Sequence, residues 1–182
     1  MKPPYARSGF TLVELLIMMA LVAIVGSLAT GSLGRLGHAI RLRTVTEDFL
    51  GSLRLARSEA LKRNVRVTMC KSASGESCTG VGDWGQGWIV FEDADQNAAV
   101  GPGEPVIRRF QAIPADWRLT GNDLVGTYIS YAPNGRTRTI TNAFQAGTVT
   151  LCRAGGDAAA RQVVINNSGR VRAAAARVDS CP

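Results

Sequence analysis

The sequence predicts an α+β protein in which a long N-terminal α-helix packs on a small antiparallel β-sheet head. Residues 10–62 contain no proline, so nothing forces a helix to break there. Beyond residue 64, short apolar segments alternate with turn residues, which is typical of antiparallel strands. The length of 182 residues suits one small globular domain. We therefore expect a helix at 10–63 and a β-rich head at 64–182.

The first part of the predicted helix is apolar. Residues 10–33 are mostly hydrophobic and are interrupted near the start by Thr11 and Glu14. Roughly 20 such residues are enough for a helix to span a bilayer. Lys2 and Arg7 precede the stretch, and positive charge keeps such an end in the cytoplasm. The difference in charge between the two ends of the stretch is weak, because arginines also follow the stretch. It nevertheless favours a single-pass membrane helix with an exported head.

The second part of the predicted helix, residues 34–63, is amphipathic. Four glycines at positions 26, 31, 34 and 37 predict a local melt or kink between the two parts. Lys62-Arg63-Asn64 is a favourable helix end, because cations there face the negative end of the helix dipole. Apolar residues recur at steps of three to five and predict one buried face: Ile40, Val45, Phe49, Leu53, Ala56 and Ala60.

The head is predicted to consist of short antiparallel strands with one face on the amphipathic half of the helix. Turns are indicated at Gly101-Pro102-Gly103, Pro133-Asn134-Gly135 and 166–169. The expected strands are 65–69, 88–91, 106–113, 128–131, 148–151 and 163–165.

Four cysteines, all in the head, predict two disulfides in an exported protein. Three pairings are possible. We favour Cys70 with Cys78, which closes a short polar loop, and Cys152 with Cys181, which ties the C-terminus to an inner strand. Zinc is the competing interpretation, but the sequence has no Cys-x-x-Cys pair and a single histidine, His38.

The junction before the apolar stretch carries a specific motif. Ser8-Gly9-Phe10-Thr11-Leu12-Val13-Glu14 resembles the processing site of type IV prepilins and type II secretion pseudopilins. The resemblance implies that residues 1–9 are a leader, that prepilin peptidase cuts between Gly9 and Phe10, and that Phe10 is then N-methylated. It also implies a place in the inner membrane before assembly into a pilus or pseudopilus.

Glu14 is a carboxylate in an apolar stretch, where an unpaired charge is costly. The resemblance implies an assembly role, in which Glu14 offsets the N-terminal charge of a neighbouring subunit. Such a buried pair would set the axial register of a filament. The competing interpretation is a carboxylate favoured by the dipole at the helix start.

Two stretches of the head resemble the GspH/FimT/FimU family of minor pilins and pseudopilins. They are Trp84–Phe91, followed by an acidic loop and Pro105–Arg108, and the ending Val163–Arg172. The resemblance implies that other minor and major pilins are partners.

Arginines give the sharpest hypothesis about binding. The formal charge is +7, and removing Lys2 and Arg7 with the leader leaves +5. Gly135-Arg136-Thr137-Arg138 and Gly169-Arg170-Val171-Arg172 are two Gly-Arg-x-Arg repeats that follow turns. The second resembles the DNA-binding motif of FimT proteins, which implies sequence-independent contact with double-stranded DNA. Arg161 and Arg177 are candidates to extend this patch. Alternatively, the arginines are solvated or face an acidic subunit.

Nothing in the sequence indicates an enzyme or a cofactor, because no nucleophile, base and orienting group can be assembled around His38. Asp93, Asp95, Asn97 and Glu104 have the spacing of a calcium loop. However, Ala98 stands where that loop needs glycine, and Pro102 interrupts it. A polar hairpin loop is the preferred interpretation, and no metal is expected.

Three functions remain open. The first is structural, a minor type IV pilin that joins other minor pilins in a priming or tip complex. The second is a receptor at the pilus tip that binds DNA for uptake in natural transformation, and one chain can have both roles. The third is a minor pseudopilin of type II secretion that acts in protein export without binding DNA.

Overall fold

The computed structural model describes residues 10–155 and 159–181, and within 27–35 it describes the backbone alone. The predicted leader, residues 1–9, lies outside the described residues, and so does the expected cleavage site after Gly9. The chain divides into two compact units, residues 1–41 and residues 42–182, which are described separately. The α-helix α1 (Leu12–Arg63) contributes residues to both units. The unit with the sheets therefore includes the C-terminal part of α1.

In the first unit, α1 begins with a side-chain cap. The hydroxyl of Thr11 accepts a hydrogen bond from the backbone N–H of Glu14 at 3.3 Å, which satisfies one of the free N–H groups at the helix start. The apolar side chains described from Phe10 to Val25 are exposed, Phe10 by 79%. The backbone stays helical from Gly26 to Gly37, so the melt predicted there is wrong, whereas the alternative of a kink stays a prediction. Among the described residues, no helix has both the length and the apolar character needed to cross a membrane.

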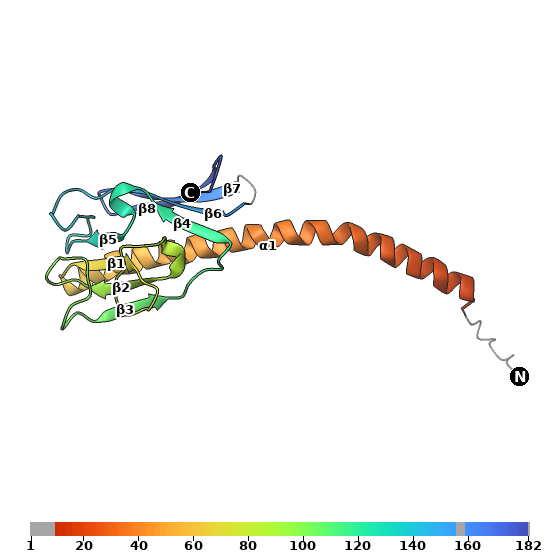
Figure 1. The fold of residues 1–182 in the computed structure, drawn as a ribbon, viewed down its shortest axis with the longest axis horizontal. Coiled ribbons are helices and arrows are strands. Elements are labelled where there is room, and N and C mark those ends of the chain that lie inside the picture. Colours follow the sequence, from red (N-terminus) through yellow and green to blue (C-terminus); the bar gives the residue numbers. More distant parts are fainter. Residues whose placement is uncertain (1–9, 156–158, 182) are drawn as a thin grey trace, which may run out of the picture. The chain divides into compact units, whose positions relative to one another are not determined.

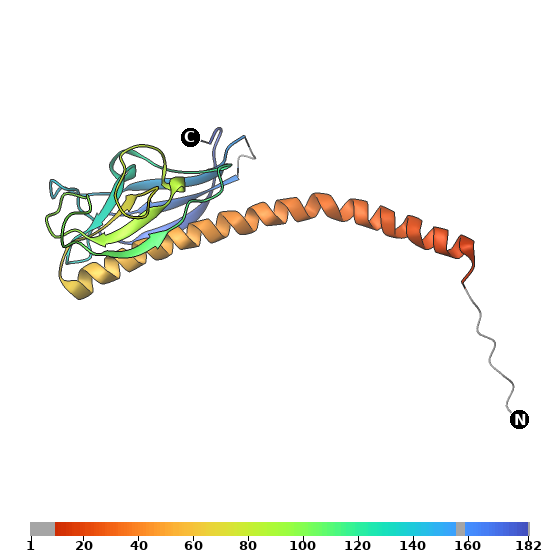
Figure 2. The same ribbon diagram turned by 60° about the horizontal axis from the view of Figure 1, so that its bottom comes forward.

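The second unit joins residues 42–63 of α1 to two four-stranded antiparallel sheets (Figures 1 and 2). One sheet has the order β3-β2-β1-β5 and the other β4-β6-β7-β8. The strands are β1 (Val67–Lys71), β2 (Trp88–Glu92), β3 (Val106–Phe110), β4 (Trp117–Gly121), β5 (Tyr128–Tyr131), β6 (Gly147–Arg153), β7 (Ala159–Ile165) and β8 (Val171–Arg177). Two short 3-10 helices span Trp84–Gln86 and Asp123–Val125.

The α+β class is confirmed, but the sequence analysis expected one sheet and missed two strands. β8 contains four consecutive alanines, which have low strand propensity. It is a strand because its residues pair along their whole length with β7. β4 has only five residues and is held by pairing with β6. Both strands depend on partners distant in sequence, which local patterns do not reveal.

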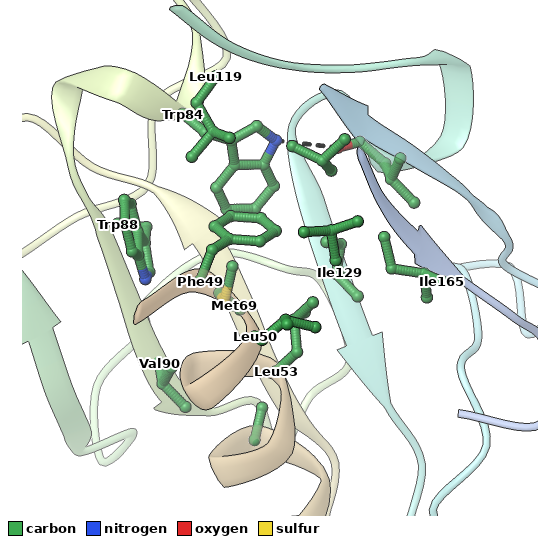
Figure 3. Close-up of a cluster of buried hydrophobic side chains, with 14 of the residues drawn as sticks. Phe49, Leu50, Leu53, Met69, Trp84, Trp88, Val90, Leu119, Ile129 and Ile165 are labelled. Atoms are coloured by element: carbon green, nitrogen blue, oxygen red, sulfur yellow. Dashed lines mark hydrogen bonds between the residues drawn. The ribbon is translucent and has the colours of Figure 1, made fainter. Parts of the chain in front are cut away.

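Phe49 of α1 lies at the centre of the core (Figure 3). Its ring meets the rings of Trp84 and Trp88 edge to face, each at 5.3 Å between centroids. Both indole N–H groups have acceptors, the carbonyl of Val125 at 3.0 Å and the hydroxyl of Ser52 at 2.8 Å. The predicted helix face is buried at five of its six positions, Val45, Phe49, Leu53, Ala56 and Ala60. Ile40, the sixth, is 56% exposed.

Two disulfides close the head in the favoured pairing, Cys70 with Cys78 and Cys152 with Cys181. Beside the first, the buried ammonium group of Lys71 donates to the carbonyls of Gly80 and Gly82, at 3.2 and 2.8 Å. Burial lowers the pKa of Lys71. The disulfide and this ammonium group together hold the loop that connects β1 to Trp84.

Candidate nucleic-acid interface and acidic loop

The two Gly-Arg-x-Arg repeats begin in turns of the same geometry. In the first turn, the N–H of Ala132 donates to the carbonyl of Arg136 at 2.9 Å. In the second, the N–H of Asn166 donates to the carbonyl of Arg170 at 3.1 Å. The glycine before each arginine has a positive φ, 73° in the first turn and 76° in the second. The repeats in the sequence are thus two copies of one backbone structure.

The two turns lie against each other. A side chain on Gly169 would overlap the carbonyl oxygen of Gly135, so the two backbones are in close contact. The hydroxyl of Thr137 donates to the carbonyl of Asn166 at 3.0 Å and links the turns. Arg57 of α1 lies beside both turns. A Cβ atom added to Gly135 would be 3.1 Å from the Nε of Arg57, and one added to Gly169 would be 3.3 Å from it. Segments 34 residues apart in the chain therefore form one surface.

The arginines of the repeats differ in their surroundings. Arg136, Arg170 and Arg172 are exposed. Arg138 is partly buried, with its guanidinium 4.6 Å from the ring centre of Phe144 and a hydrogen bond to a backbone carbonyl. Three of the four repeat arginines are therefore free to meet a ligand, whereas Arg138 is held by its own loop.

Arg161 and Arg177, the arginines expected to extend the patch, lie on a different face of the sheet from Arg172. Arg172 lies opposite Val164, and Arg161 lies opposite Ala175, in a regular β7–β8 register. Because strand side chains alternate, Arg161 and Arg177 share the face of the sheet that is opposite to that of Arg172. The structure does not bring Arg161 and Arg177 together with Arg172.

The sequence analysis did not single out two arginines of α1. Arg54 and Arg57 line a cavity of about 250 Å³ together with Gly169, Arg170 and Val171. Their spacing of three residues places them on one side of the helix. The only sequence signal was their position among the polar residues of an amphipathic helix, which is shared by many solvated side chains.

The acidic loop brings three carboxylates together. One oxygen each from Asp93, Asp95 and Glu104 lies within 4.8 Å of the others. Glu104 accepts hydrogen bonds from three backbone N–H groups of the loop, of Ala94 at 2.7 Å, Asp95 at 3.3 Å and Gly101 at 2.8 Å. It therefore holds the two ends of the loop together.

Asp93 is fully buried and accepts hydrogen bonds from the hydroxyl of Thr68 at 2.6 Å and the N–H of Ala98 at 3.3 Å. Burial raises the pKa of Asp93 and the Thr68 hydrogen bond counteracts it. Ala98 has a φ of 59°, the left-handed conformation for which a calcium loop uses glycine. These contacts give Asp93 and Glu104 a structural role, because their carboxylates bind backbone N–H groups of the loop.

Two family profiles match the chain. The profile described as "Type II transport protein GspH" matches residues 45–169, and the prokaryotic N-terminal methylation motif matches residues 5–30. The first covers more than half of the chain, so the protein belongs to the GspH family of pilin-like proteins. It is a structural, non-enzymatic subunit, a minor pilin or pseudopilin with a prepilin methylation motif. Membership implies processing by prepilin peptidase, anchoring in the inner membrane and assembly with other pilins.

The fold is similar to that of a particular minor pilin. Two crystal structures of the type IV minor pilin FimU from Pseudomonas aeruginosa (strain PAO1) align with TM-scores of 0.59 and 0.57, both at 18% identity. The alignments cover 80% and 78% of this chain, and 98% and 100% of the FimU chains in those two crystal structures. At this identity the likeness shows the fold alone. A comparison with curated proteins gives no match.

Proposed function

We propose that this protein is a minor type IV pilin of the priming or tip complex, and that its Gly-Arg-x-Arg turns bind double-stranded DNA without sequence preference during uptake. One observation supports this proposal above the others: two turns of the same geometry are in contact and carry the exposed arginines 136, 170 and 172. In the described part of the chain, none of these three forms an ion pair. Guanidinium groups pair well with phosphate oxygens, and such pairs carry no base specificity.

Removal of positive charge from this surface is the direct test. Arg170→Gln/Arg172→Gln is expected to weaken binding of full-length protein, in uncharged detergent micelles, to a fluorescent DNA duplex by about tenfold or more. The dependence of log K on log salt should become shallower by about one unit per lost phosphate contact. Arg43→Gln/Lys62→Gln removes two exposed cations of α1 outside the turns and should bind nearly as the unmodified protein does. Absence of binding by the unmodified protein at low salt would overturn the DNA proposal.

A pseudopilin of type II secretion is the second candidate, and the description of the matching family profile favours it. The two candidates share leader chemistry and fold, so the phenotype of a deletion separates them. Loss of twitching motility or transformation supports the pilus. Loss of protein secretion with both of those intact supports the pseudopilus.

The N-terminal part of the proposal concerns processing and assembly. We expect the protein extracted from membranes to begin with N-methylated Phe10, which mass spectrometry of the N-terminal peptide detects.

Glu14→Ala should still be cut and methylated but should be lost from sheared filaments, because it removes the carboxylate that offsets a neighbour's terminal amine. Thr11→Ala removes the helix cap, typically worth about 1 kcal/mol, and serves as a control that leaves the carboxylate in place. A Glu14→Ala variant that enters filaments normally would contradict the assembly role.

A further inference from the structure

The cavity between α1 and the second Gly-Arg-x-Arg turn is lined by three arginines. Arg54 and Arg57 come from the helix, and Arg170 comes from the turn, beside Gly169 and Val171. The cavity of about 250 Å³ is smaller than the roughly 300–1,000 Å³ of pockets that hold drug-sized ligands. It suits a small anionic group rather than a whole nucleotide.

The positive charge of this cavity has no partner within the described part of the chain. The nearest acid along the helix, Glu59, already pairs with Arg63. The Nε of Arg57 is buried and has no hydrogen-bond acceptor. A buried N–H without a partner is uncommon in folded proteins and is costly. A bound anion would reduce the repulsion between three neighbouring cations.

We propose that this cavity is a phosphate-binding pocket, in which Arg54, Arg57 and Arg170 hold one phosphate group of a bound nucleic acid. The inference rests on the proposed DNA binding and adds a helix-borne anchor to it. Carboxylates and phosphates both fit a guanidinium fork. Phosphate of a polyanion is favoured because a further exposed arginine, Arg136, follows Gly135 in the turn that contacts Gly169, where the next phosphates of a chain would meet it and a lone carboxylate would not.

The test compares variants of the full-length protein in uncharged detergent micelles. Arg54→Gln/Arg57→Gln should weaken duplex binding about tenfold or more and lower the salt slope by about one unit. Arg43→Gln/Lys62→Gln removes the same charge from the same helix outside the pocket and should change binding less than threefold. Arg54→Gln alone alters an exposed side chain and should give an intermediate loss, which keeps the test valid if the double variant is poorly folded.

A second measurement examines the pocket without DNA. The arginine Nε–H resonance of Arg57 should move and saturate with inorganic phosphate, and move less with acetate at equal ionic strength. Two results would each overturn the pocket proposal and leave the Gly-Arg-x-Arg proposal standing. One is duplex binding by Arg54→Gln/Arg57→Gln that equals binding by the control variant. The other is an Arg57 resonance that phosphate does not change. Absence of duplex binding by the unmodified protein would overturn both.

Discussion

Phe49→Ala is expected to lower the free energy of unfolding of residues 42–182 by about 3–5 kcal/mol, the usual cost of removing a fully buried phenylalanine ring. The ring touches both Trp84 and Trp88, so the loss includes two edge-to-face contacts as well as buried area. Urea denaturation followed by tryptophan fluorescence measures this change, because both indoles report on the environment of the missing ring.

Leu61→Ala on the same helix is the matched control, since Leu61 is 52% exposed. It should cost less than about 1 kcal/mol. Equal losses in the two variants would show that Phe49 does not occupy the centre of the core. The expected difference follows from burial alone, because both substitutions remove large apolar side chains from one helix.

Gly169→Ala is expected to lower the free energy of unfolding by about 3 kcal/mol or more. A residue with a side chain at a φ of 76° costs about 1–2 kcal/mol, and the new methyl group would also overlap the carbonyl oxygen of Gly135. Relief of the overlap requires the two turns to separate. We therefore also expect weaker duplex binding, because the turns that carry Arg136 and Arg170 would no longer be in contact.

Gly103→Ala separates the two causes. Gly103 has a φ of 83° but open space around its Cβ position, so this variant should show the backbone cost alone, about 1–2 kcal/mol. Thermal and urea unfolding of both variants give the comparison. Similar losses at the two positions would mean that the turns are not in contact in solution, and the shared arginine surface would then lose its basis.

Much of the chain could be predicted because its signals are local. The motif around Gly9 and Phe10 indicated the family, and the family profiles confirm it. The spacing of Val45, Phe49 and Leu53 indicated which face of the helix is buried, because the 3.6-residue period places them on one side. The positions of the two Gly-Arg-x-Arg repeats after turns were also readable, since glycine and asparagine mark turns.

The division into two sheets could not be predicted. β8 has the composition of a helix or a loop and becomes a strand only by pairing with β7. Strand pairing depends on partners far along the chain, and its energy lies in cross-strand contacts rather than in local preference. The same reason explains the missed β4.

The sequence by itself determined the long helix, its buried face, the turn chemistry and the residue types of the candidate interface. Only the tertiary structure decided that the turns at Gly135 and Gly169 are in contact and that Arg54 and Arg57 lie beside them. It also separated Arg161 and Arg177 from Arg172, across two faces of one sheet. Local sequence sets backbone conformation over a few residues, whereas the distance between remote arginines depends on strand register and on packing against the helix.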